Sequence, residues 1–152
     1  MKKNILNPLE LFETHSGYTQ DPDINPNYIR PQMFMFRLQK IMDEYAGGVS
    51  SCFETNKPLL ERGLELIAML KEDAEKVAAE TLNELTRAWE NIHRMWIAES
   101  HVRHLLFREE TRWPGYYYRS DFKKMDEDNW HCFVNSVWDP ASGEWTMKKV
   151  PI

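Results

Sequence analysis

The chain has 152 residues, 42% of them hydrophobic and 28% charged, a composition typical of one globular domain. Its formal net charge of −5 argues against nucleic-acid binding, which needs a clustered positive field. No apolar run reaches the ~18 residues of a membrane-spanning helix and no signal-peptide core follows Met1, so we expect a soluble, cytoplasmic protein without membrane insertion.

Residues 1–30 contain several residues that interrupt helices and strands, among them Pro8, Gly17, Pro22 and Pro26. The apolar residues between them show no regular spacing. We predict an extended arm over residues 1–30 that lies along a protein surface. A disordered end is the alternative.

Two helices are predicted before residue 80. The first begins at Pro31, whose fixed φ suits a first helical turn, and Gly47-Gly48 ends it. The second begins near Asn56 and Pro58. Its apolar stripe consists of Leu60, Leu64, Ile67, Leu70, Ala74 and Val77.

A third helix is predicted from Leu82 to Glu109. Thr81 and Glu84 form a T-x-x-E capping box, which predicts a helix break near Glu80 although no Gly or Pro marks it. The apolar stripe changes side along this helix, so different partners must cover its two halves. We predict an all-α fold in which residues 31–110 form a three-helix bundle.

The C-terminal residues have the pattern of a β-hairpin. Trp130 to Trp138 alternate and favour a strand, Asp139 to Gly143 have turn chemistry, and Glu144 to Val150 form a second strand. Two strands alone are marginally stable in water, so the hairpin must pack on the bundle or on a partner. Residues 111–152 therefore form an irregular segment followed by a hairpin, within a single domain overall.

Candidate metal ligands are concentrated on the third helix. Helical spacings used in metal sites occur at Glu90 and His93 and at His101 and His104, but further ligands are not evident. No nucleophile motif or glycine-rich phosphate cradle occurs. Cys52 and Cys132 lack metal-type spacing and are predicted to be free, buried or half-buried thiols. We predict no catalytic, cofactor-binding or metal-binding residue, and a metal-dependent helical enzyme is the least favoured hypothesis.

The segment from Phe107 to Trp130 is rich in aromatic and arginine side chains, as the centres of protein interfaces are. Its arginines suit carboxylates such as Glu109, Glu110 and Asp121 or the acids of a partner. We predict that it docks on another domain or subunit, and an internally packed surface loop is the alternative. The docking candidates are Arg108, Arg112, Trp113, Tyr116, Tyr117, Tyr118, Arg119, Asp121 and Trp130.

The same segment carries a resemblance to a known family. Five stretches resemble the C-terminal helical region of the alpha (flavoprotein) subunit of dissimilatory adenylylsulfate reductase. They are REETRWPGYYYRSDF, DEDNWHCFVNS, INPNYIRPQ, FRLQKIMDEYAGGVS and LTRAWENIHRMW. The wider superfamily of fumarate reductase and succinate dehydrogenase flavoproteins has a comparable pattern, and the insert Trp113-Pro114-Gly115-Tyr116-Tyr117-Tyr118 points to the adenylylsulfate branch. The chain departs from it at Arg30 and Lys123, which affect local turns.

The resemblance implies a spectrin-like, up-and-down three-helix domain that packs against a flavin-binding domain. It implies an enzyme that reduces adenylylsulfate to sulfite and AMP, with FAD held by preceding domains and 4Fe-4S clusters in a beta subunit. We therefore expect a non-catalytic docking domain whose partners are the flavin-binding domain and the iron–sulfur beta subunit. A free-standing helical interaction module is the alternative function. The sequence leaves the oligomeric state and the direction of catalysis open.

Overall fold

The structure is a computed structural model that describes residues 29–79, 81–112 and 117–152. The predicted arm over residues 1–30 lies outside the described residues except for its last two positions. No helix in the described ranges is long and apolar enough to cross a membrane.

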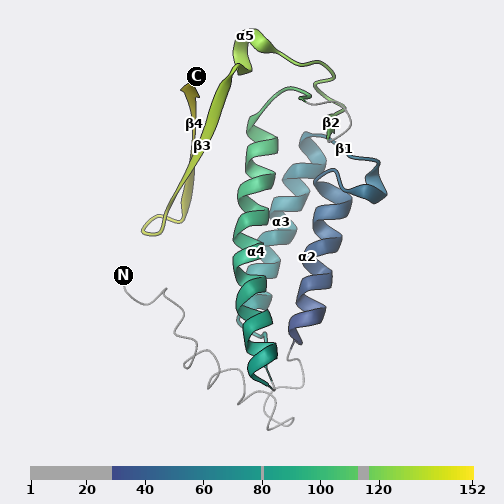
Figure 1. The fold of residues 1–152 in the computed structure, drawn as a ribbon, viewed down its shortest axis with the longest axis vertical. Coiled ribbons are helices and arrows are strands. Elements are labelled where there is room, and N and C mark those ends of the chain that lie inside the picture. The colour runs from purple at the N-terminus through teal and green to yellow at the C-terminus, as the bar shows by residue number, and fades with distance from the viewer. Residues whose placement is uncertain (1–28, 80, 113–116) are drawn as a thin grey trace. The chain divides into compact units, whose positions relative to one another are not determined.

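The described residues are mostly helical, with four α-helices and a small antiparallel hairpin (Figure 1). The helices are α2 (Pro31–Tyr45), α3 (Lys57–Ala74), α4 (Leu82–Phe107) and α5 (Glu127–Trp130), with a 3-10 turn η1 (Val49–Ser51). The strands are β1 (Glu54–Thr55), β2 (Tyr118–Arg119), β3 (Cys132–Asp139) and β4 (Glu144–Pro151). The predicted mainly helical class with a C-terminal hairpin is confirmed, and the spectrin-like bundle stays a prediction.

The chain divides into two compact units, and each of the three long helices contributes to both. The first unit contains the described residues up to Lys40 together with Leu66–Ile97. Within it, Asn91 of α4 donates to the Pro31 carbonyl of α2 over 2.7 Å. Arg37 of α2 pairs with Asp73 of α3 at 2.6 Å, so α2 contacts both of the other helices here.

The end of α3 differs from the prediction. The helix stops at Ala74, and Val77, which was predicted to continue its stripe, forms a parallel bridge with Ile29 instead. Val77 is nonetheless buried, because the bridge places it in the core of the first unit. The predicted cap is confirmed where α4 begins, since the Glu84 amide donates to Thr81 Oγ1 over 3.2 Å.

The second unit contains Ile41–Glu65 and Ala98–Ile152. Gly63 of α3 lies between two helices in this unit, because a Cβ placed on it would be 3.2 Å from Tyr45 Cβ and 4.0 Å from Val102 Cγ1. After α2 the chain turns through Gly47 and Gly48, as predicted. It then enters β1, which pairs in parallel with β2 through Glu54–Tyr118 and Thr55–Arg119.

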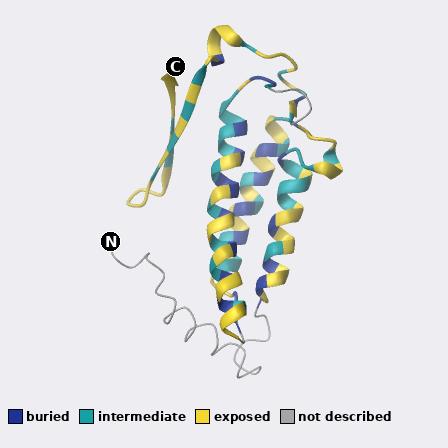
Figure 2. Ribbon diagram, in the orientation of Figure 1, coloured by how far each residue is buried: buried dark blue, intermediate teal, exposed yellow. Residues whose placement is uncertain are grey.

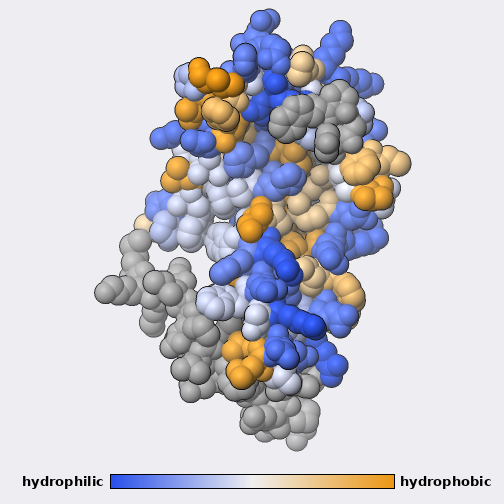
Figure 3. Space-filling view, in the orientation of Figure 1, coloured by the Kyte–Doolittle hydropathy of each residue, from blue (hydrophilic) through white to orange (hydrophobic). Residues whose placement is uncertain are grey.

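The hairpin has one half-buried and one exposed face. Side chains along β3 alternate between intermediate and exposed, as a strand of period two requires (Figure 2). Phe133 is paired with Val150 on the exposed face. Hydrophobic surface is visible over the end of the hairpin at which β4 ends (Figure 3). Trp130, predicted to start the strand, lies in α5 instead, because Asp126 caps that helical turn.

Candidate functional site

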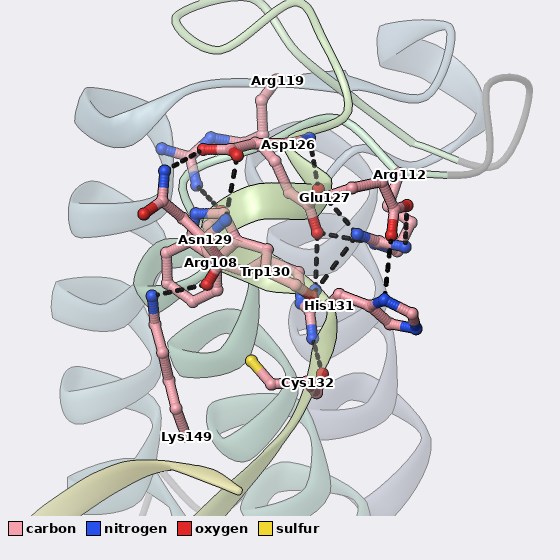
Figure 4. A network of polar contacts seen from close by, with 11 residues as sticks. Arg108, Arg112, Arg119, Asp126, Glu127, Asn129, Trp130, His131, Cys132 and Lys149 are labelled. Atoms are coloured by element: carbon pink, nitrogen blue, oxygen red, sulfur yellow. Dashed lines mark hydrogen bonds and ion pairs between the residues drawn. The ribbon is translucent and has the colours of Figure 1, made fainter. Parts of the chain in front are cut away.

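Three arginines and three carboxylates form a connected cluster in the second unit, of which Figure 4 labels the arginines and Glu127. Its members, called the arginine cluster below, are Arg108, Arg112, Arg119, Glu110, Asp121 and Glu127. The cluster begins where α4 ends and continues to α5. It therefore occupies the segment that the sequence singled out.

Glu110 is fully buried at the centre of this cluster. Its Oε1 accepts from Arg108 at 2.5 Å and from Arg112 Nε at 2.6 Å, and its Oε2 accepts from Arg112 at 3.0 Å. The Asp126 amide donates a further bond to Oε2 over 2.9 Å. Burial alone would raise the pKa of Glu110, but the hydrogen bonds from Arg112, Asp126 and Arg108 outweigh it and lower the pKa. The carboxylate is thus a structural anion.

Arg112 connects this centre to α5. Its Nη1 lies 3.0 Å from Glu127 Oε1, while its other nitrogens bind Glu110. The hydrogen bond to Glu110 raises the pKa of Arg112, and the charge of Glu127 adds to the effect. The guanidinium group is held by two carboxylates from the same chain.

Arg119 and Asp121 join the ends of two helices. Arg119 is buried, and its Nη1 donates to the Leu105 and Arg108 carbonyls at the C-terminal end of α4. Asp121 accepts from Arg119 at 2.8 Å and from the Lys57 amide at the start of α3 at 2.9 Å. A cation at a helix C-terminus and an anion at a helix N-terminus both complement the helix dipole. The Arg119 bond lowers the pKa of Asp121.

Trp130 is buried against the same cluster. The Phe107 ring meets it edge to face at 5.6 Å between centroids, and Lys149 Nζ from β4 lies 3.5 Å from the ring centroid. Lys149 also donates to the Asn129 carbonyl over 3.0 Å, an arrangement visible in Figure 4. These contacts attach β4 to α5. No sequence pattern pointed to Lys149, because pairing of a lysine with a ring so far away in the chain depends on the tertiary fold.

The predicted docking residues have different surroundings. Five of them meet in or beside the cluster: Arg108, Arg112, Arg119, Asp121 and Trp130. Of the tyrosines, Tyr117 is half-buried and Tyr118 is exposed. The remaining two, Trp113 and Tyr116, lie outside the described residues. The three arginines bind carboxylates of this chain, and their docking role stays a prediction. Among the docking candidates that the structure describes, Tyr118 is the exposed aromatic residue.

The three histidines of α4 make different contacts. His93 packs on Trp89 at 5.5 Å, and His104 Nδ1 donates to the Ser100 carbonyl over 2.7 Å. Partial desolvation lowers the pKa of His101, whose side chain still reaches solvent, and the charge of the nearby His104 adds to this. No group of three potential metal ligands occurs among the described residues. Both cysteines are free thiols, Cys132 half-buried as predicted and Cys52 exposed, contrary to the prediction, because it lies on the turn after η1.

Comparison with known proteins identifies the family. Residues 35–152 match the family described as the fumarate reductase flavoprotein C-terminal region. The chain belongs to this family. It is 48% identical over 151 residues, 99% of its length, to the alpha subunit of adenylylsulfate reductase from Megalodesulfovibrio gigas, of which it spans 23%. The resemblance inferred from the sequence is confirmed.

Solved structures of relatives agree with this assignment. Adenylylsulfate reductase from Archaeoglobus fulgidus matches with a TM-score of 0.85 and 54% identity, covering 95% of this chain and 23% of that chain. A variant of Escherichia coli quinol fumarate reductase shares the fold, with a TM-score of 0.74 at 16% identity and the same coverage of 95% and 23%. The chain thus spans about a quarter of the length of these relatives.

Proposed function

We propose that the chain acts as the C-terminal helical domain of an adenylylsulfate reductase alpha subunit, without an active site of its own, and docks onto the flavin-binding part of that enzyme. Family membership and the 23% span of the relatives support this. The whole enzyme would reduce adenylylsulfate to sulfite and AMP, with FAD bound by the flavin-binding part and with an iron–sulfur beta subunit as partner.

The proposal extends to architecture and location. Residues 31–110 would form an up-and-down, spectrin-like three-helix bundle, and residues 111–152 the docking segment with its hairpin. The contacts of α2 with α3 and α4 in the first unit support the bundle. Two free thiols suit the reducing conditions of the cytoplasm.

The observation that carries the docking role is a pair of exposed aromatic residues, Phe53 immediately before β1 and Tyr118 in β2. The Tyr118 amide donates to the Phe53 carbonyl over 2.7 Å, and the two residues are 39% and 40% exposed. Cys52 and Phe53 both have positive φ, at 53° and 61°. Such a conformation costs about 1–3 kcal/mol per non-glycine residue and recurs at functional sites. The strained backbone thus holds the Phe53 ring in its exposed position. The arginine cluster fixes Arg119, and with it the position of the neighbouring Tyr118.

The test uses the chain and the part of the Megalodesulfovibrio gigas alpha subunit that lies outside the matched region. Sedimentation of the mixture should detect a one-to-one complex, and the chain alone should show no flavin absorbance. Replacing Phe53 and Tyr118 with Ser should weaken the complex about tenfold or more, since exposed aromatic anchors dominate interface energies. The matched control is Phe36→Ser, which removes a 51%-exposed ring from α2.

Two results would overturn the proposal. A wild-type chain that forms no complex would favour the free-standing interaction module. Equal weakening by Phe36→Ser would show that the paired rings do not define the docking site.

A further inference from the structure

A cavity of about 370 Å³ lies beside the arginine cluster and opens to solvent. Its walls come from the last turns of α4, from α5 and the start of β3, and from Tyr117, the neighbour of the exposed Tyr118. All of these residues belong to the second unit. This volume falls in the range of pockets that bind small ligands or single side chains.

The lining combines apolar surface with hydrogen-bond donors. Leu105, Val134 and the Trp130 ring supply the apolar part. Arg108 and Tyr117 supply donors, and burial raises the pKa of Tyr117, so its hydroxyl stays protonated at neutral pH. No aspartate or glutamate is among the described residues that line the cavity.

The carboxylates that pair with Arg108 and Arg112 lie outside the lining of the cavity. Glu110 is fully buried and binds Arg108 from outside the cavity. The Trp130 and Cys132 carbonyls accept from Arg108 at 2.9 and 2.8 Å, so these acceptors are already engaged. Arg108 and Arg112 are thus paired with carboxylates outside the lining, while the lining itself presents their N–H groups and the Tyr117 hydroxyl but no carboxylate, which favours an anionic over a cationic guest.

The walls are also held in place before any guest arrives. Trp130 is fixed by Phe107 on its edge and Lys149 at 3.5 Å, and Arg108 is fixed by its three acceptors. A pocket whose side chains are already ordered loses little entropy on binding. The cavity is thus pre-organised for a guest with an apolar body and a negative end.

We propose that this cavity receives an apolar side chain with a carboxylate beside it, carried by the flavin-binding part onto which the chain docks. The inference rests on the proposed function for its partner. The pocket chemistry itself can be tested on the chain alone.

The probes are 3-phenylpropionate and 3-phenylpropylamine, which share an apolar body and differ in charge. Titrations followed by the NMR signals of the Trp130 indole and the Tyr117 ring should show saturable binding of the carboxylate. The amine should bind about tenfold more weakly or not at all, because like charges are placed together. Equal binding of the two probes, or binding of neither, would overturn the proposal.

Two variants locate the binding. Val134→Phe fills the cavity and should abolish 3-phenylpropionate binding, whereas Val137→Phe on the exposed face of β3 should leave it unchanged. Tyr117→Phe should weaken the carboxylate about tenfold through one lost charge-assisted hydrogen bond, with Tyr45→Phe as its control. This second, milder variant gives a result even if Val134→Phe does not fold. Binding that is unchanged in Tyr117→Phe would contradict the assigned donor.

The docking assay separates this inference from the proposed function. If wild type docks and a folded Val134→Phe variant docks equally well, the cavity is not part of the interface and the inference fails alone. If wild type does not dock, the proposed function and the named partner of the cavity both fail, and the probe titrations then report only on the pocket's chemistry.

Discussion

Arg112 and Glu110 form a two-point ion pair in which Arg112 Nε lies 2.6 Å from Oε1 of Glu110 and Nη2 lies 3.0 Å from Oε2. This fork geometry is the one for which a guanidinium group is better suited than an ammonium group. Because Glu110 also binds Arg108 and the Asp126 amide, one buried carboxylate connects the end of α4 to the segment before α5.

Glu110→Gln should lower the free energy of unfolding by about 3 kcal/mol or more. Removing one partner of a buried pair leaves the other charge uncompensated, here on two guanidinium groups. Urea unfolding measures the effect. Glu109→Gln is the matched control, because the neighbouring glutamate is exposed and should change stability by less than about 0.5 kcal/mol. Equal midpoints for the two variants would contradict the role given to Glu110.

The stability of the chain should fall in acid through the same residue. The pKa of Glu110 is below its ordinary value of 4.5, so the folded state binds protons less readily than the unfolded state. Its contribution is fully present above pH ~4.5 and is lost as the pH falls through the lower folded pKa. The difference in unfolding free energy between wild type and Glu110→Gln should therefore shrink below that pH. Parallel curves for the two proteins would refute this.

The sequence predicted those helix ends that depend on local signals. Pro31, Gly47-Gly48 and the Thr81 cap each act within one turn, and the structure has helix ends at all three. The sequence failed at Val77, because its apolar spacing fits a helix while the bridge to Ile29 depends on a distant segment. The local apolar pattern cannot distinguish a helix from a bridge when both bury the residue.

The candidate site was predicted in part. Charge alone suggested Glu109, Glu110 and Asp121 as partners for the arginines. Glu110 and Asp121 form those pairs, whereas Glu109 is exposed. Which arginine would be buried was not predictable, because the burial of Arg119 follows from the pairing of β2 with β1, two short strands far apart in sequence. The Asp126 cap was a readable signal, since Asp three residues before a helical amide is a common N-cap.

Trp89→Ala should destabilise the first unit by about 3 kcal/mol. Trp89 packs on the buried Ala79 and Leu85, and truncation of a large ring there leaves a cavity. Leu82→Ala at an exposed position of the same helix is the control. Thermal unfolding distinguishes them, because 1 kcal/mol corresponds to about 2–4 °C in a chain of this size. Equal melting temperatures would show that Trp89 does not contribute to the core.

Lys149→Met should loosen the hairpin while keeping the apolar stem of the side chain. The loss of the contact with the Trp130 ring is worth about 0.5–1 kcal/mol. Hydrogen exchange of the β3 and β4 amides should accelerate in this variant. Lys148→Met, one residue earlier on the same strand, should leave exchange unchanged. Similar acceleration in both would mean that charge in general, and not the ring contact, protects the hairpin.

Gly48→Ala should cost more stability than Gly143→Ala, although Gly143 is the one of these two glycines with a positive φ, at 73°. A Cβ on Gly48 would lie 2.4 Å from Asp43 Cα, so the backbone must shift, and overpacking of this kind costs about 1–3 kcal/mol. A Cβ on Gly143 meets nothing within 4 Å and adds only the left-handed backbone strain of about 1 kcal/mol. Because Gly48 leads into the turn that positions Phe53, its variant should also weaken docking, which sedimentation with the flavin-binding part would measure. A larger effect of Gly143→Ala on either quantity would contradict the close approach at Gly48.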